Sequence, residues 1–89
     1  MDELIGEKVL VKEERLGTFF GTLIDRDKSG VRLKDCTKIV SARSKKFMRT
    51  EELKDMYILG GVMVIQCSNA DAEYLENLPV KRKLFPSFS

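Results

Sequence analysis

Hydrophobic and polar residues alternate along the first part of the chain in a pattern that predicts β-strands. In residues 7–13, Val9 and Val11 fall on one side of the chain, whereas the lysines and Leu10 fall on the other. A period of two is typical of a strand with one buried face. Residues 18–24 are rich in aromatic and β-branched side chains and are apolar on both sides. We therefore expect this second strand to lie in the centre of a sheet.

Glycine and turn residues divide these strands and bend them. Gly17 precedes the second strand, where it can adopt a positive φ, and residues 25–30 have the composition of a polar turn. Gly21 lies inside the second strand, which indicates a bend or a close approach of another backbone. Residues 31–41 resume the alternation, but its phase shifts near Asp35. This shift predicts one long strand with a bulge.

The second half of the chain contains shorter elements. Residues 43–55 are polar and basic and are expected to form a loop, and Gly60–Gly61 separates two short β-rich segments. Ser68 or Asn69 caps a short helix that ends before Pro79. The expected fold is mainly β, with one domain at residues 1–78 and a mobile tail at residues 79–89. Its elements are an N-terminal helical turn (2–5), five antiparallel strands (7–13, 18–24, 31–41, 56–59 and 62–67) and the C-terminal helix (69–78).

Composition excludes several functional classes. The 89 residues include no histidine, which is the commonest general base at neutral pH, and no phosphate-binding or dinucleotide-binding glycine motif. We therefore expect neither catalysis nor a cofactor or metal. The two cysteines lie at a spacing that indicates neither zinc binding nor a disulfide framework, so an intracellular protein with reduced thiols is expected. No apolar segment is long enough to predict a membrane span or a signal peptide.

The order and spacing of two motifs point to a family. The first motif comprises a hydrophobic strand at 9–11, Gly17, the segment 21–23, Asp27 and the alternating residues 31–33. The second is the segment Ile58-Leu59-Gly60-Gly61 followed by the hydrophobic residues 62–65. Together they cover residues 3–67 and resemble the Sm/LSm family of small, SH3-like barrels that assemble into rings and bind single-stranded RNA.

This resemblance implies a strongly bent, five-stranded antiparallel barrel with an N-terminal helix stacked on it. In that fold the last two strands present free edges, and copies of the chain pair through them. The implied assembly is a homo-oligomeric ring, hexameric or heptameric, and the alternative for its contact residues is the core of a single subunit. The candidate contacts between subunits are Met56, Ile58, Met63 and Ile65.

The resemblance also implies an RNA site built from two loops, at Lys28, Ser29 and Gly30 and at Leu59, Gly60 and Gly61. The chain departs from the family at two of these positions, because Gly30 stands where an asparagine holds the base and Leu59 stands where an arginine stacks on it. An aliphatic side chain offers neither the plane nor the donors of a guanidinium group. The alternatives are a solvated hairpin turn for the first loop and a sharp corner for the second.

Positive charge is concentrated in one stretch around Phe47. Its basic residues combine charge with an aromatic ring, as in proteins that bind single strands, although exposed charged loops are common. These possible RNA contacts are Arg43, Lys45, Lys46 and Arg49. The sequence therefore predicts a non-catalytic, ring-forming protein that binds single-stranded RNA as a scaffold or chaperone. The alternative is a protein-interaction module on the same fold that does not recognise RNA.

Overall fold

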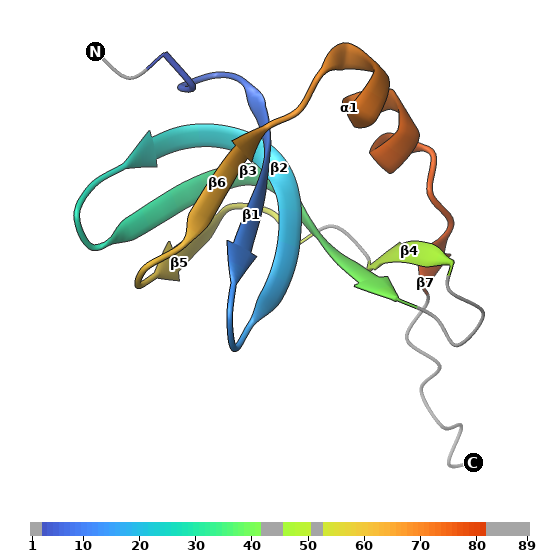
Figure 1. Ribbon diagram of the computed structural model, residues 1–89, viewed down its shortest axis with the longest axis horizontal. Coiled ribbons are helices and arrows are strands. Elements are labelled where there is room, and N and C mark those ends of the chain that lie inside the picture. The colour runs from blue at the N-terminus through green and yellow to red at the C-terminus, as the bar shows by residue number, and fades with distance from the viewer. Residues whose placement is uncertain (1–2, 42–45, 51–52, 82–89) are drawn as a thin grey trace.

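The computed structural model describes residues 3–41, 46–50 and 53–81 of a mainly β protein with one short helix (Figure 1). Its strands are β1 (Lys8–Glu13), β2 (Gly17–Arg26), β3 (Gly30–Ser41), β4 (Phe47–Thr50), β5 (Met56–Leu59), β6 (Met63–Gln66) and β7 (Val80–Lys81). The helix α1 (Asn69–Glu76) lies between β6 and β7.

The strands form one mixed sheet in the order β6-β1-β2-β3-β4-β7, and β5 branches from it by pairing with β3. Every pairing is antiparallel except that of β4 with β7. The long strand β3 makes the branch possible, because its first residues pair with β5 and its last residues pair with β4. The prediction of five antiparallel strands in a barrel needs correction. The described residues form seven strands in a mixed sheet, and no pairing among them closes the sheet.

The predicted irregularity of β3 is confirmed. Phe20 pairs with Thr37, whereas Thr22 pairs with Lys34, so the register shifts opposite Gly21. Asp35 in the shifted segment has a φ of 51°. A Cβ on Gly21 would lie 3.0 Å from the carbonyl oxygen of Lys34, so Gly21 permits the close approach of the two backbones. The resulting bulge bends β2 and β3 and allows them to curl around a core.

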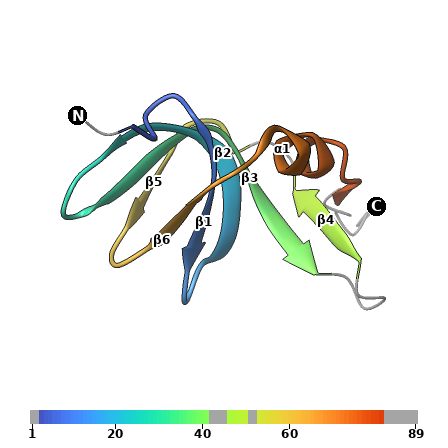
Figure 2. The ribbon, with the colours of Figure 1, turned by 45° about the horizontal axis from the view of Figure 1, so that its top comes forward.

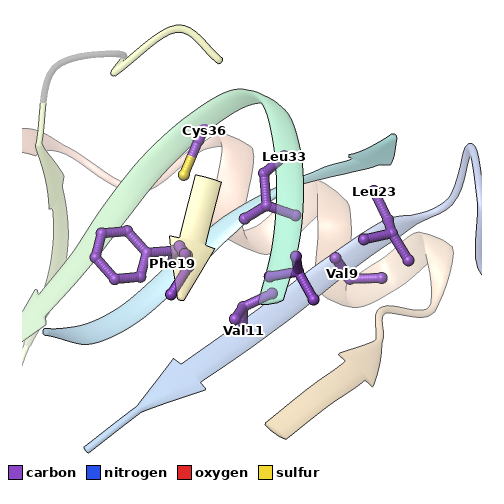
Figure 3. Close-up of a cluster of buried hydrophobic side chains, with 8 residues drawn as sticks. Val9, Val11, Phe19, Leu23, Leu33 and Cys36 are labelled. Carbon is purple, nitrogen blue, oxygen red and sulfur yellow. The ribbon is translucent and has the colours of Figure 1, made fainter. Parts of the chain in front are cut away.

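The main core lies inside this curl (Figure 3). It is assembled from β1, β2, β3 and β5, so that segments distant in sequence share one interior. Burying each large aliphatic side chain contributes about 1.5–3 kcal/mol relative to leaving it exposed. Leu4, Met56, Val62 and Val64 pack around the rim. The buried members are Val9, Val11, Phe19, Leu23, Val31, Leu33, Cys36 and Ile58.

Helix α1 lies beside the bend of β2 and β3 (Figure 2). It covers a second, smaller cluster on the outer face of the sheet. Leu75 and Leu78 pack on Phe20, and Leu10 and Ile39 lie beside them. The predicted cap is confirmed, because the Ser68 hydroxyl oxygen accepts a hydrogen bond from the backbone N–H of Asp71 at 3.1 Å. The apolar outward position of Leu10 is thus covered by the C-terminal helix.

Two further expectations need correction. Residues 3–6 form a hydrogen-bonded turn in place of the N-terminal helical turn, with Gly6 at a φ of 88°. The predicted loop at residues 43–55 contains the strand β4, which is held between β3 and β7. Strand β7 lies beyond residue 78, where the sequence placed the start of a tail.

No helix within the described ranges is long and apolar enough to cross a membrane.

Candidate nucleic-acid interface

Two turns that are distant in the sequence lie side by side at one end of the molecule, away from α1 and β4 (Figures 1 and 2). The first joins β2 to β3 at residues 27–30, and the second follows β5 at residues 59–61. Gly30 is the register partner of Leu59, and the Gly60 N–H donates a hydrogen bond to the Ser29 carbonyl oxygen at 2.9 Å. We call residues 27–30 and 59–61 the turn-pair surface. It brings together all six residues that the two predicted loops supply.

The carboxylate of Asp27 fixes the shape of the first turn. Its Oδ1 atom accepts hydrogen bonds from the backbone N–H groups of Ser29, at 2.7 Å, and Gly30, at 3.1 Å. The Asp27 N–H in turn donates to the Gly30 carbonyl oxygen at 3.0 Å. The hydrogen bond from the Ser29 N–H, followed by those from the Tyr57 hydroxyl and the Gly30 N–H, holds the pKa of the Asp27 carboxyl below its usual value. The turn is therefore rigid, and Lys28 and Ser29 are exposed at its tip.

The three glycine positions of the turn-pair surface differ in whether the structure requires a glycine there. Gly30 is buried, and a Cβ there would overlap the Ile58 carbonyl oxygen, so it permits contact between β3 and β5. Gly60 has a φ of 102°, which favours glycine in the corner after β5. A Cβ on Gly61 would meet no atom within 4 Å, and its φ is not in the left-handed region. The backbone around Gly61 is therefore open to a ligand, and no packing requirement explains that glycine.

Tyr57 extends the turn-pair surface along the outer face of β5. Its hydroxyl donates a hydrogen bond to Asp27 Oδ1 at 3.0 Å, and its side chain is 40% exposed. The Arg32 guanidinium carbon, from β3, lies 5.6 Å from the centroid of the Tyr57 ring. Desolvation and the neighbouring Asp27 carboxylate raise the pKa of Tyr57. Both side chains belong to outward positions of strands that pair with each other.

Sequence reasoning missed Tyr57 and Arg32 as candidate site residues. The available signal was their alternation with the inward-facing Ile58 and Leu33. That signal shows that each faces outward, but it does not show that they are register partners. Their proximity follows from the pairing of β5 with β3, which only the fold establishes.

The four candidate contacts between subunits divide into two groups. Ile58 is fully buried in the main core, which was the alternative for these residues, and Met56 packs against the same core. Met63 is 60% exposed, and Ile65 is also exposed. Leu59, in the second turn, is 64% exposed. Apolar side chains therefore meet solvent on both sides of Gly60–Gly61.

The strands β5 and β6 each have one unpaired edge in the described part of the chain. Strand β5 pairs only with β3, and β6 pairs only with β1. The N–H and C=O groups along such an edge are available to another strand. The geometry thus offers two edges that a second polypeptide can occupy.

The basic stretch around Phe47 lies in a different part of the molecule. Arg49 is half-buried, and its Nε donates a hydrogen bond to the Leu78 carbonyl oxygen at 3.2 Å, which ties β4 to the segment after α1. Lys46 is exposed, whereas Arg43 and Lys45 lie outside the described residues. Phe47 lines a hollow of about 300 Å³ together with Tyr74 of α1. The structure therefore does not join Lys46 and Arg49 to the turn-pair surface.

The thiols lie within or beside the two apolar clusters. Cys36 is buried in the main core, and desolvation raises its pKa to about 11. Cys67 is half-buried beside α1, and its pKa is raised by desolvation and by the carboxylate of Asp71. Within the described ranges, no three His, Cys, Asp or Glu side chains are grouped so that they could hold a metal ion.

Comparison of the chain with protein families, with curated proteins and with solved structures finds no match.

Proposed function

We propose that this protein binds single-stranded RNA, without catalysis, at the turn-pair surface. The observation that carries the proposal is the hydrogen bond between the Gly60 N–H and the Ser29 carbonyl oxygen. It joins the two loops that the Sm-like pattern implicates, although about thirty residues of chain separate them. A single strand is commonly recognised by several loops that converge on one nucleotide.

The chemistry of the surface suits a single strand. Lys28 is exposed at the tip of the first turn and forms no ion pair with another described residue, so its ammonium group is available to a phosphate. The open backbone at Gly61 permits close approach of a nucleotide. The amide side chain that would read a base edge in the family is replaced by Gly30. We therefore expect binding that depends on salt and shows no strong preference for uridine.

Assembly into a ring is the second part of the proposal. Strands β5 and β6 have edges that no described strand covers, and antiparallel pairing of β5 with β6 of a neighbouring copy would occupy both. Such a contact is head-to-tail, so it closes into a ring where the rotation between copies permits. The curl of β1, β2, β3, β5 and β6 around one core supports an Sm-like arrangement, and a hexamer or heptamer is proposed by analogy with that family.

The competing function is a protein-interaction module. It is favoured by Leu59 and Met63, which are the two most exposed large apolar side chains of the described chain and flank the glycine pair. Exposed apolar side chains in one region are typical of protein contacts. In the ring, by contrast, Met63 is expected to be covered by a neighbouring copy.

Fluorescence anisotropy of a labelled RNA tests the proposal. Lys28→Ala is expected to weaken binding to oligoadenosine, oligouridine and a mixed strand alike and to reduce the salt slope by about 0.7, the contribution of one phosphate contact. Lys81→Ala is the matched control, because Lys81 is exposed on β7, at the opposite end of the molecule from the turn-pair surface. Absence of binding to all three strands at about 50 mM salt would remove the RNA function.

A pull-down with and without nuclease separates the two functions. Partners that require intact RNA support the proposal. Partners that survive nuclease and are lost in Leu59→Ser support the protein-interaction module.

A further inference from the structure

We infer that Tyr57 is the base-stacking platform of the turn-pair surface and that Arg32 supplies the guanidinium group that Leu59 cannot. The inference rests on the proposed RNA function and names the chemistry of its ligand, a purine-rich single strand. Neither residue lies in the two loops, so the sequence motifs do not indicate them.

The first step is the fixed orientation of the Tyr57 ring. Its hydroxyl donates to the same Asp27 oxygen that accepts from the Ser29 and Gly30 N–H groups. The ring is thus tied to the rigid first turn at one end and to β5 at the other. A platform that is ordered before binding loses little conformational freedom when a base stacks on it.

The second step is the position of the Arg32 guanidinium. It lies 5.6 Å from the centroid of the Tyr57 ring, within the range of a cation–π contact. Arg32 is exposed and forms no ion pair with another described residue. A base that stacks on Tyr57 would lie near this cation, which is available to the phosphate. Stacking and positive charge are the two features that single-strand sites combine.

The third step concerns access. Strand β5 has no described neighbour on the side away from β3, and the Tyr57 ring stands out of the plane of the sheet. Backbone pairing along the β5 edge uses groups that lie in that plane. Stacking on Tyr57 and assembly through β5 are therefore compatible.

The fourth step gives the base preference. Residues 27–30 and 59–61 contain no asparagine or glutamine to read a base edge. Selectivity then comes from stacking strength. A purine has two fused rings and overlaps more of the tyrosine face than a pyrimidine does. We expect oligoadenosine to bind more tightly than oligouridine of the same length.

The test compares matched tyrosine variants by anisotropy with labelled oligoadenosine. Tyr57→Leu is expected to weaken binding about 5- to 150-fold, as for the loss of one stacked base, whereas Tyr57→Phe keeps the ring and weakens it less. Tyr74→Leu removes the other tyrosine, on α1, and should leave the affinity unchanged. Arg32→Lys keeps the positive charge but lacks the planar guanidinium group, and it should weaken binding less than Arg32→Gln.

Intrinsic fluorescence provides a direct readout of stacking. The chain has two tyrosines and no tryptophan, so Tyr57 is the only such fluorophore in Tyr74→Phe. Oligoadenosine should quench its emission more strongly than oligouridine does, with free tyrosine amide correcting for absorption by the RNA. Tyr57→Leu is checked by circular dichroism to confirm that it folds.

The outcomes distinguish this inference from the proposed function. RNA binding that is equal in wild type and folded Tyr57→Leu would overturn the inference and leave the function in place. Loss of affinity in Tyr74→Leu alone would move the site to the hollow beside Phe47. Absence of RNA binding by the wild type would overturn both.

Discussion

Gly30 of β3 lies directly against the carbonyl group of Ile58 in β5, so that a Cβ on Gly30 would overlap the carbonyl oxygen. This close approach holds the first turn against the second. Gly30→Ala should lower the free energy of unfolding by about 1–3 kcal/mol, because β3 and β5 must move apart. Gly61→Ala is the matched control, since a Cβ there meets open space, and its effect should be within about 0.5 kcal/mol. Urea unfolding measures both, and equal stability of the two variants would contradict the packing.

The division of the predicted contact residues into core and surface can be tested directly. Ile58→Ala removes a fully buried side chain and should lower the free energy of unfolding by about 2–5 kcal/mol. Met63→Ala changes a side chain that is exposed in the single chain and should alter the free energy of unfolding of the monomer by no more than about 0.5 kcal/mol. Chemical denaturation measures the free energy of unfolding of both variants. A large decrease in Met63→Ala with none in Ile58→Ala would contradict the assignment of Ile58 to the core and Met63 to the surface.

Assembly provides a separate prediction for Met63. If neighbouring copies pair through β5 and β6, Met63→Lys should shift the species in sedimentation toward the 10.2 kDa monomer while the fold is retained. Lys81→Met is a control that adds an apolar side chain at a distance, on β7, and should leave the assembly unchanged. A wild-type chain that remains monomeric at high concentration would contradict the ring.

Stability should depend on the protonation of Asp27. Its pKa is lowered in the folded state, so its contribution is fully present above its usual value of 3.8 and is lost as pH falls through the lower, folded-state value. The Oδ1 atom of Asp27→Asn still accepts hydrogen bonds but does not titrate. The stability difference between wild type and Asp27→Asn should shrink between about pH 7 and about pH 2.5. Urea midpoints at the two pH values measure it, and a constant difference would refute the role of the carboxylate.

The two thiols should differ in reactivity. Cys36 is fully buried, and its pKa of about 11 leaves little thiolate at neutral pH, whereas Cys67 is partly accessible. An aromatic disulfide reagent should modify Cys67 first and reach Cys36 only as the protein unfolds. The variant Cys67→Ser should leave only a slow phase. A fast phase in that variant would show that the main core is more open than the structure indicates.

Local patterns in the sequence predicted most of the elements. Alternation located β1 and β3, and aromatic and β-branched residues located β2. The phase shift at Asp35 located the bulge, and the capping residues Ser68 and Asn69 marked the start of α1. These features depend on neighbouring residues and on backbone preferences, which a sequence displays. The glycine pair likewise marked the corner between β5 and β6.

Pairings over long sequence distances could not be predicted in the same way. Strand β4 has only four residues, and Val80 and Lys81 form β7 by pairing with Arg49 and Thr50, so tertiary contacts decide both strands. For the same reason the sequence did not place Tyr57 beside Arg32. The N-terminal residues carry helix-favouring acids, but Gly6 donates its N–H to the Leu23 carbonyl oxygen and ends the turn early.

Mapping of amide chemical shifts in a ¹⁵N-labelled sample titrated with oligoadenosine tests the central claim most directly. The account predicts that the perturbed amides cluster at residues 28–32 and 57–61, with little change in α1 and β4. Perturbation confined to α1 and β4, or no perturbation at any concentration of RNA, would contradict it.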